Sequence, residues 1–364
     1  MEASLTAKIQ ELGDLELAAL LCLIAGEHCI ITTKTNLVND VAQELLLICQ
    51  RIFGLTFAVV ECSENTSLDD FREAVLVDGP DEFHDSYESH PTDHNIHLRL
   101  PQSLPSRQPS VQSSNQSNRL DERRVADVVL AKNLSTANHQ VQIQALELIR
   151  TKRLFSHTAM HATSHNFLLV VIQPLGLPPL TKHLNDLFAI SHHHSNADGF
   201  PNLEDASQSR LDDGNASIAS SNRSMTSDMG EQNGAVFSQA DIDALRHATV
   251  QTHTTAEVMA HLHHIPIFMK LSRWIAGGVS AMATRQLRSI SRALAPLHGV
   301  TYVTPSLVQL AARKVYPHRL VLATTKTERS LQWGSDVREV ERLLKGMTVQ
   351  KAIDDVLASV ETPL

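Results

Sequence analysis

The sequence predicts an α/β protein in which a parallel β-sheet is sandwiched by helices and is followed by an all-α lid subdomain. Short apolar strands alternate with helical segments over the first half of the chain, which is the order of βαβ units. From Ser238 onward only helical periodicity remains, with Ser238 as a helix N-cap and prolines between the segments. Two polar segments interrupt this order.

The predicted elements differ in length and in the spacing of their apolar residues. We expect helices at Leu15–Ala25, Leu37–Phe53 and Gln140–Ile149. The expected strands are His28–Ile31, Phe57–Cys62, Val128–Ala131, Phe167–Ile172 and Leu187–Ser191. Because helices separate these strands, a parallel sheet with helices on both faces is favoured.

Ser, Asn, Gln and Asp dominate two segments, Asp78–Arg124 and Ser195–Val236, which contain few bulky apolar residues. Such segments bury too little surface to offset chain entropy, so we expect disordered inserts. The predicted organisation is an α/β core over residues 1–194 with an insert at 78–124, a linker over 195–236, and a helical lid over 237–364.

Composition restricts the partners and the compartment. The 364 residues carry a formal net charge of −9, which gives no electrostatic footprint for nucleic acid. The apolar run Leu15–Ile31 is interrupted by Glu16 and Glu27, so no membrane span is expected. All four cysteines lie in the first 62 residues without CxxC spacing, which indicates reduced core thiols of a cytoplasmic protein, with a nuclear location left open.

Four stretches resemble parts of a known family. ADVVLAKNLSTANHQVQIQALELIRTKRLF is similar to the family's acidic-pair strand and following helix, FLLVVIQP to its sensor strand, and LTKHLNDLF to its arginine-finger segment. The end of its helical lid is similar to LHGVTYVTPSLVQLAARKVYPHR. The chain thus resembles AAA+ ATPases of the MoxR and magnesium-chelatase I-subunit group, and more closely their fungal magnesium-chelatase-like relatives.

The phosphate loop of that family is not preserved. Its pattern GxxxxGK[ST] needs glycines so that backbone N–H groups can surround the phosphates. Here HCII runs into TTKTNLVND, with no glycine between Gly26 and Gly54. The family register places Asn39 and Asp40 at the Lys and Thr positions. Lys34 and Thr35 match the Lys-Thr dipeptide of the phosphate-loop pattern, but they follow the predicted strand His28–Ile31 too closely to leave room for the loop. We therefore expect an ordinary loop there.

The other catalytic positions of the family are also replaced. The resemblance places Lys132 and Asn133 at the metal-holding Asp and water-activating Glu, and a cation there opposes Mg²⁺. The sensor Asn, the arginine finger and the lid arginine correspond to Pro174, Leu187 and Met282. We therefore expect no catalytic residue and no cofactor, with ATP and Mg²⁺ bound only if the chain is an active subunit.

Twenty histidines raise the question of a metal site. Three groups stand out, namely His192–His194, then His157, His161 and His165, and finally His261, His263 and His264. No Cys or Glu completes a ligand set in any group, so we expect exposed or packing histidines and no metal.

Two lid features carry alternatives. IPIFMKLSRWIAGG either packs within the lid or contacts a partner through Phe268 and Trp274. A basic group near the lid end is expected to be a solvated helix face, although the resemblance places this region against the core: Arg313, Lys314, His318 and Arg319.

Three functions remain open at this point. The first is a degenerate AAA+-like scaffold or non-hydrolysing subunit that binds protein partners or AAA+-like subunits. The second is an ATPase-type subunit of a magnesium-chelatase-like complex, active only with partner subunits; the family name implies ATP-driven insertion of Mg²⁺ into protoporphyrin. The third is a histidine-rich metal-binding protein.

Overall fold

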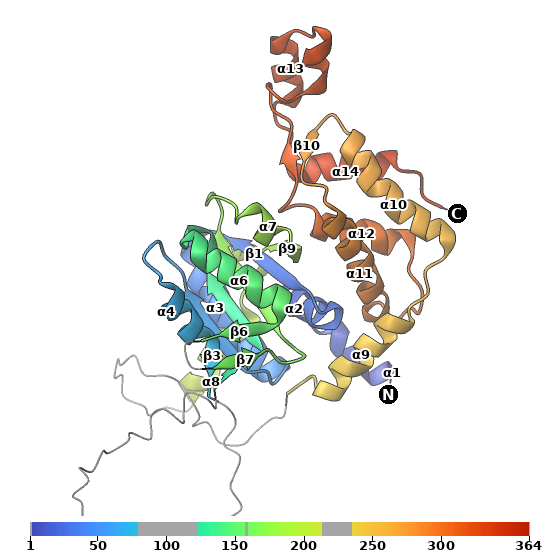
Figure 1. Ribbon diagram of the computed structural model, residues 1–364. Helices are drawn as coiled ribbons and strands as arrows, with labels where there is room; N and C mark the ends of the chain where they lie inside the picture. The colour runs from blue at the N-terminus through green and yellow to red at the C-terminus, as the bar shows by residue number, and fades with distance from the viewer. Residues whose placement is uncertain (1, 79–122, 157–158, 213–234, 364) are drawn as a thin grey trace, which may run out of the picture.

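A five-stranded parallel sheet forms the centre of the molecule (Figure 1). The computed structural model describes residues 2–78, 123–156, 159–212 and 235–363. The strand order is β2-β5-β8-β1-β9, and every neighbouring pair is parallel. The strands are β1 His28–Thr33, β2 Phe57–Glu61, β5 Val128–Lys132, β8 Leu168–Pro174 and β9 Phe188–His193. The five predicted strands are all present, and their carboxyl ends meet at one edge of the sheet.

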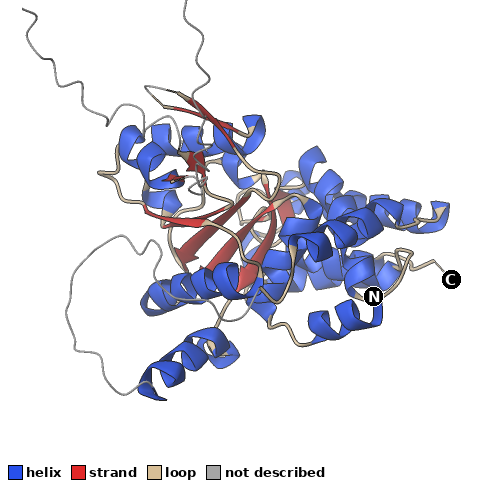
Figure 2. Ribbon diagram, turned by 90° about the horizontal axis from the view of Figure 1, so that it is seen from below, coloured by secondary structure: helices blue, strands red, loops and turns tan. Residues whose placement is uncertain are grey.

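Helices cover both faces of this sheet (Figure 2). Successive side chains of a strand point to opposite faces, so Val128 and Leu130 of β5 enter one core, while Val129 and Ala131 enter the other. Helices α2 and α3 line the first core, and α4 and α6 line the second. The helices of this part are α1 Glu2–Gln10, α2 Asp14–Ala25, α3 Val38–Leu47, α4 Leu68–Val75, α6 His139–Thr151 and α7 Lys182–Asn185.

Within the described residues 235–363, six helices follow the core and form the lid (Figure 1). They are α9 Gln239–Gln251, α10 Ala256–Leu271, α11 Ala281–Leu297, α12 Pro305–Val315, α13 Val337–Leu344 and α14 Val349–Ser359. Helix α9 contacts both α2 and α11, and α12 packs along the edge strand β9. The lid therefore rests on the side of the sheet, while α13 projects away from the rest of the molecule.

Three short antiparallel pairs supplement the central sheet. They are β3 Leu76–Val77 with β4 Arg124–Val125, β6 Arg153–Phe155 with β7 Met160–Ala162, and β10 Ile275–Gly277 with β11 Val321–Leu322. The last pair is a short addition to the lid, which is otherwise helical as predicted. Gly278 follows β10 with φ +98°, and a Cβ atom there would lie 2.0 Å from the Arg319 carbonyl oxygen. Only glycine fits this close approach.

The start of the second segment that was predicted to be disordered is folded instead. Residues 195–212 contain a 3₁₀ turn, Asn196–Asp198, and helix α8, Pro201–Asp212. The buried carboxylate of Glu44 accepts hydrogen bonds from the backbone N–H groups of Asn202 and Leu203 at 3.0 and 2.8 Å. These bonds satisfy free N–H groups at the start of α8, which stabilises the helix. Residues 79–122 and 213–234 of the predicted inserts lie outside the described residues.

Two expectations from composition concern the membrane and the thiols. In the part of the chain that the structure describes, no helix is both long and apolar enough to cross a membrane. The four cysteines are free and buried, as predicted for core thiols.

Candidate functional site

The carboxyl edge of the sheet brings together most of the positions at which the family resemblance places nucleotide chemistry. Strand β5 ends at Lys132, and its neighbour β8 ends at Pro174, which pairs with Thr33 at the end of β1. Helix α3, which begins just beyond β1, carries Asn39 and Asp40 in its first turn. In open α/β sheets, ligands bind outside the carboxyl ends of the strands, so this edge is the candidate site.

Lys132 lies on this edge at the end of β5, between the ends of β2 and β8. Its Nζ donates to Asn39 Oδ1 and lies against Glu61 Oε2, both at 3.1 Å. Its side chain is 12% exposed, whereas that of Glu61 is 71% exposed. A partly buried ammonium therefore lies where the resemblance places a metal-holding carboxylate, and its two partners come from α3 and β2.

The connection between β1 and α3 is too short to surround phosphates. After Thr33 it consists of Lys34 and a 3₁₀ turn, Thr35–Leu37, before α3 begins. The backbone N–H of Leu37 donates to the Lys34 carbonyl oxygen at 2.9 Å, so this donor is already used within the turn. Lys34 and Thr35 are exposed, as in an ordinary loop.

Asn133 follows Lys132 in a left-handed conformation with φ +56°. Its backbone N–H donates to the Ile172 carbonyl oxygen at 2.8 Å, which joins the tips of β5 and β8. Its Oδ1 is buried and has no partner among the described residues; the same holds for Thr33 Oγ1 and Gln173 Oε1. Three neighbouring strand ends thus carry unpaired polar atoms.

This arrangement does not fit a magnesium nucleotide. Magnesium sites in such enzymes use carboxylate and phosphate oxygens, and here an ammonium lies at the carboxylate position. The chain also has no glycine over the loop between β1 and α3 that would let backbone N–H groups approach a phosphate. No chemical step is therefore derived through ATP.

Leu187 and Met282 lie at the opposite edge. Leu187 directly precedes β9, and its carbonyl oxygen accepts a hydrogen bond from Gln286 Nε2 at 3.1 Å. Met282 lies in the first turn of α11, which is fastened to the same edge because Ser280 Oγ donates to Asp186 Oδ1 at 2.6 Å. The structure thus separates these two positions from the group around Lys132.

Arg319 is an important residue that the sequence did not reveal. The expectation of a solvated face is wrong for it, because its side chain is 2% exposed and lies between lid and core. Its guanidinium donates to the Phe188 carbonyl oxygen and to Gln286 Oε1, and it lies 3.7 Å from Asp186 Oδ1. Burial and the neighbouring guanidinium lower the pKa of His318 to about 3, and this neutral ring contacts the Phe188 carbonyl oxygen.

The remaining basic residues at the lid end differ from Arg319. Arg313 is exposed and pairs with Asp354 at 2.9 Å, and Lys314 approaches His192 Nδ1 at 3.5 Å. The basic group is therefore a solvated face only in part. The segment after α12 carries both His318 and Arg319, and its local sequence gave no sign of which side chain would be buried.

The predicted histidine groups form no metal-binding cluster among the described residues, although the rings of His192 and His194 lie 6.3 Å apart. Among the described residues, no group of three or more potential ligands could hold a metal ion. His161 lies on β7, where its Nδ1 contacts the Arg123 carbonyl oxygen at 2.7 Å, and His261 Nδ1 contacts the Glu361 carbonyl oxygen at 3.0 Å. His157 lies outside the described residues.

Comparison with known proteins adds the family context. The AAA lid domain family matches residues 271–342, which include β10, α11 and α12. A Cytophaga hutchinsonii protein provisionally described as an ATPase has a similar crystal structure, with a TM-score of 0.63, 14% identity, and coverage of 100% of this chain and 97% of that chain.

A full-length MCM homolog from Methanopyrus kandleri matches less well, with a TM-score of 0.43, 11% identity, and coverage of 88% and 59% of the two chains. No protein with a curated description matches the sequence. The parallel sheet flanked by helices, the lid match and the likeness to the Cytophaga structure together show that this chain has the AAA+ fold, an α/β core followed by an AAA lid domain.

Proposed function

We propose that this chain is a catalytically degenerate AAA+ protein that acts as a scaffold or non-hydrolysing subunit of a protein assembly. Within the AAA+ proteins we place it in the MoxR and magnesium-chelatase I-subunit group, near the fungal magnesium-chelatase-like family. The observation that carries the proposal is the ammonium of Lys132, held between Asn39 and Glu61 at the tip of β5.

Phosphoryl transfer depends on positioning and on positive charge around the phosphates. A resident cation at the metal position repels Mg²⁺ instead of coordinating it, and its attraction for phosphate is reduced because Glu61 already neutralises it. Neither Asn39 nor Asn133 can replace the missing charges. The chain therefore keeps the fold without the groups that hydrolysis needs.

The attachment of the lid supports a static role. The lid is held to the core by hydrogen bonds from Arg319, Ser280 and Gln286 to residues at or just before the start of β9 and β1. One of them joins Gln286 Nε2 to Glu27 Oε2 at 2.9 Å. Lid movement is a common response to ligand binding in enzymes. A lid held by buried polar bonds at the edge remote from Lys132 does not need nucleotide to keep its position.

An apolar area on the lid supports a role in protein assembly. Phe268 and Leu271 at the end of α10 are 38% and 66% exposed, and Trp333 is 87% exposed. The segment that carries Trp333 is attached beside them, because Arg329 donates to the Lys270 carbonyl oxygen at 2.6 Å. Trp274 instead packs within the lid and donates to Asp355 at 2.9 Å. Exposed aromatic residues are typical anchors of protein interfaces.

The chain's compartment is also a proposal. The four cysteines are reduced, buried and without a disulfide, which favours the cytoplasm, with the nucleus as the other reducing compartment.

A second candidate is a subunit that binds nucleotide only within a mixed assembly. The observation that favours it is the set of unpaired polar atoms at the carboxyl edge, because buried polar atoms normally have partners. Under this candidate a neighbouring subunit would supply the missing cationic and acidic groups. Its substrate could then be that of a magnesium-chelatase-like complex.

Calorimetric titration of the full-length chain with MgATP and MgADP tests the proposal. We expect no saturable heat at sub-millimolar nucleotide. Micromolar binding that is removed by Lys132→Ala or Asn39→Ala would place nucleotide at the carboxyl edge and would reject the proposal. Size-exclusion chromatography with light scattering, repeated on Leu271→Lys and Trp333→Ser, reports whether the lid surface mediates assembly.

A further inference from the structure

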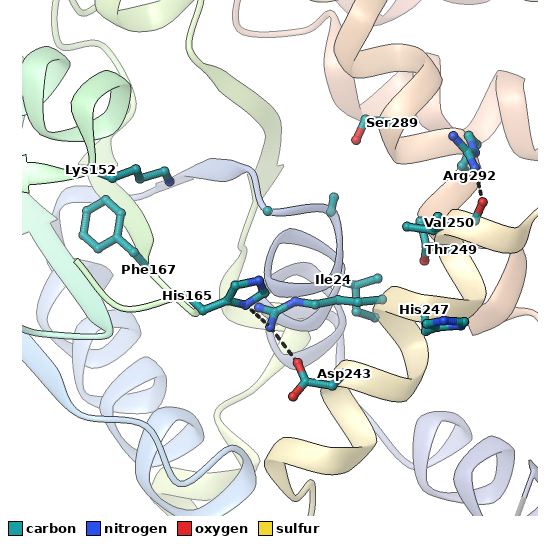
Figure 3. A pocket seen from close by; sticks show the side chains of 13 residues that line it. Ile24, Lys152, His165, Phe167, Asp243, His247, Thr249, Val250, Ser289 and Arg292 are labelled. Atoms are coloured by element: carbon teal, nitrogen blue, oxygen red, sulfur yellow. Dashed lines mark hydrogen bonds and ion pairs between the residues drawn. The ribbon is translucent and has the colours of Figure 1, made fainter. Parts of the chain in front are cut away.

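A cavity lies at the amino edge of the sheet, opposite the group around Lys132. Its volume is about 630 Å³, within the usual range of small-molecule sites. Gly26, just before β1, and Phe167, just before β8, belong to its core side, whereas α9 and α11 form its lid side (Figure 3). The cavity therefore lies between the two parts of the molecule.

Cationic side chains dominate this cavity. Lys152, Arg246 and Arg292 line it, while Asp243 is the only carboxylate among the described lining residues. Asp243 is already paired with Arg246, with an Nη1 to Oδ1 distance of 3.0 Å. The excess of positive charge is unusual for a chain whose net charge is −9. Two cations, Lys152 and Arg292, thus remain without a carboxylate within ion-pair distance among the described residues.

Arg246 is a structural part of the wall. Its Nε and Nη2 donate to the Leu23 carbonyl oxygen at 3.0 and 2.9 Å, which satisfies an acceptor near the end of α2. Its Nη1 also donates to His165 Nδ1 at 2.7 Å. All three guanidinium nitrogens are engaged, so Arg246 contributes charge to the cavity and few free donors.

Lys152 has an ammonium without a balancing partner. The residue follows α6 with φ +57°, and its Nζ lies 5.1 Å from the centroid of the Phe167 ring. The nearest polar side-chain atom is His28 Nε2 at 3.5 Å. Burial lowers the pKa of His28 to about 3, so its ring is neutral. Its Nδ1 accepts a hydrogen bond from the Leu169 N–H at 3.0 Å, and the ring proton is therefore on Nε2.

A donor therefore faces a donor at this contact, and His28 provides no counter-charge for Lys152. Desolvation lowers the pKa of the Lys152 amine. Glu27 partly opposes this effect through its charge, but its carboxylate accepts from Gln286, and it does not line the cavity. A bound anion would supply the missing interaction for the ammonium.

Arg292 lies on the other side of the cavity. It extends from α11, and its Nη2 donates to the Val250 carbonyl oxygen at 2.6 Å. Figure 3 shows Lys152 on the core side and Arg292 with Ser289 on the lid side of the open space. A ligand that satisfies both cations must carry anionic groups at two separated positions.

We propose that this cavity binds a small polyanion with two or more phosphate or carboxylate groups. One anionic group contacts Lys152 of the core and another contacts Arg292 of the lid, while the apolar side chains of Ile24 and Phe167 border the body of the ligand. Such a ligand connects core and lid, so its binding stabilises the attachment of the lid. The site is separate from the group around Lys132 at the carboxyl edge.

The test is calorimetric titration of the full-length chain with inorganic pyrophosphate and with citrate at matched ionic strength. The variant Lys152→Gln/Arg292→Gln removes both cations, and Lys345→Gln/Arg342→Gln removes two exposed cations of the remote α13 segment as a control. Tighter binding of pyrophosphate identifies a phosphate ligand, and tighter binding of citrate identifies a polycarboxylate.

We expect saturable binding to the wild type and to the control, and a loss of about a hundredfold in affinity in the double variant, about tenfold for each cation. Lys152→Gln alone answers the question if Arg292 is needed for folding, because Lys152 follows the end of α6 and forms no ion pair with a described residue. Absence of saturable binding of either polyanion to the wild type, or equal affinity in the double variant and the control, would overturn the proposal.

Discussion

Replacement of Arg319 by alanine is the sharpest test of how the lid is held. The guanidinium is almost completely buried, donates to the carbonyl oxygens of Asp186 and Phe188, and bonds to Gln286. Alanine would remove one donor from each of these acceptors and would leave the Asp186 carboxylate without its cation. Breaking a buried ion pair by removing one partner costs about 3 to 5 kcal/mol.

Arg313→Ala is the matched control, because it removes a guanidinium from the same segment of the lid. Its pair with Asp354 has side chains that are 42% and 48% exposed, so its loss costs about 0 to 1 kcal/mol. The two variants thus separate the effect of burial from the effect of charge.

Urea unfolding followed by tryptophan fluorescence measures the difference. Both tryptophans, Trp274 and Trp333, belong to the lid, so the signal reports the part of the molecule that Arg319 attaches. With about 2 °C per kcal/mol for a chain of this size, Arg319→Ala should also lower the melting temperature by roughly 6 to 10 °C. Equal midpoints for the two variants would refute the assignment of Arg319 as the residue that fastens lid to core.

Three further predictions concern the site, the histidines and the thiols. Lys132→Asp/Asn133→Glu introduces the acidic pair of the family, yet phosphate release should stay at background. The free energy of unfolding should fall by about 1 to 3 kcal/mol, because carboxylates replace the cation beside Glu61 and because Glu is disfavoured at φ +56°. Turnover would indicate a working phosphate site elsewhere in the chain. Burial lowers the pKa of His28 and His318 to about 3, so below pH 6.5 the unfolded state binds more protons than the folded state. The free energy of unfolding should therefore fall by about 2 kcal/mol for each histidine between pH 7 and pH 5. Urea midpoints that do not change over this range would contradict the burial of these rings. Burial raises the pKa of the Cys49 and Cys62 thiols to about 12, so a thiol reagent at neutral pH should modify these thiols only after unfolding. Rapid modification of the native protein would show that they are accessible.

The central sheet and the composition of its carboxyl edge were predictable because both depend on local sequence. Runs such as Val128–Ala131 are apolar in every position, as strands buried on both faces must be. Parallel strands bring their carboxyl ends to one edge, so the predicted parallel sheet already placed Lys132 at the same edge as the segment that follows His28–Ile31. The strand order, in which β8 lies between β5 and β1, comes from the structure. The structure adds the role of Glu61, which belongs to the neighbouring strand β2.

Residues whose role depends on distant partners were not predictable. Arg319 has the sequence surroundings of a solvated helix end, and its burial results from contacts with Asp186 and Phe188, more than 130 positions earlier. Helix α8 lies in a polar stretch whose composition is typical of disorder, and its first turn depends on Glu44, 158 positions before Asn202. No local pattern contains this information.

The amino-edge cavity illustrates the same limit. Lys152 and Arg292 are 140 positions apart and belong to segments with no shared motif, so only the packing of α9 and α11 against the core brings them to one cavity. One feature of the sequence could have indicated this site. Lys152 lies directly after helix α6 and before the β6–β7 pair, which places a cation near the amino edge of the central sheet. That signal alone is weak.

A crystal structure of the full-length chain grown with millimolar Mg²⁺ and a non-hydrolysable ATP analogue tests the central claim most directly. The account predicts that the carboxyl edge stays free of phosphate and metal and that Lys132 Nζ remains bonded to Asn39 and Glu61. Density for a triphosphate in the loop after Thr33, with Mg²⁺ bound and Lys132 displaced, would contradict the claim that this AAA+ fold has lost its nucleotide site.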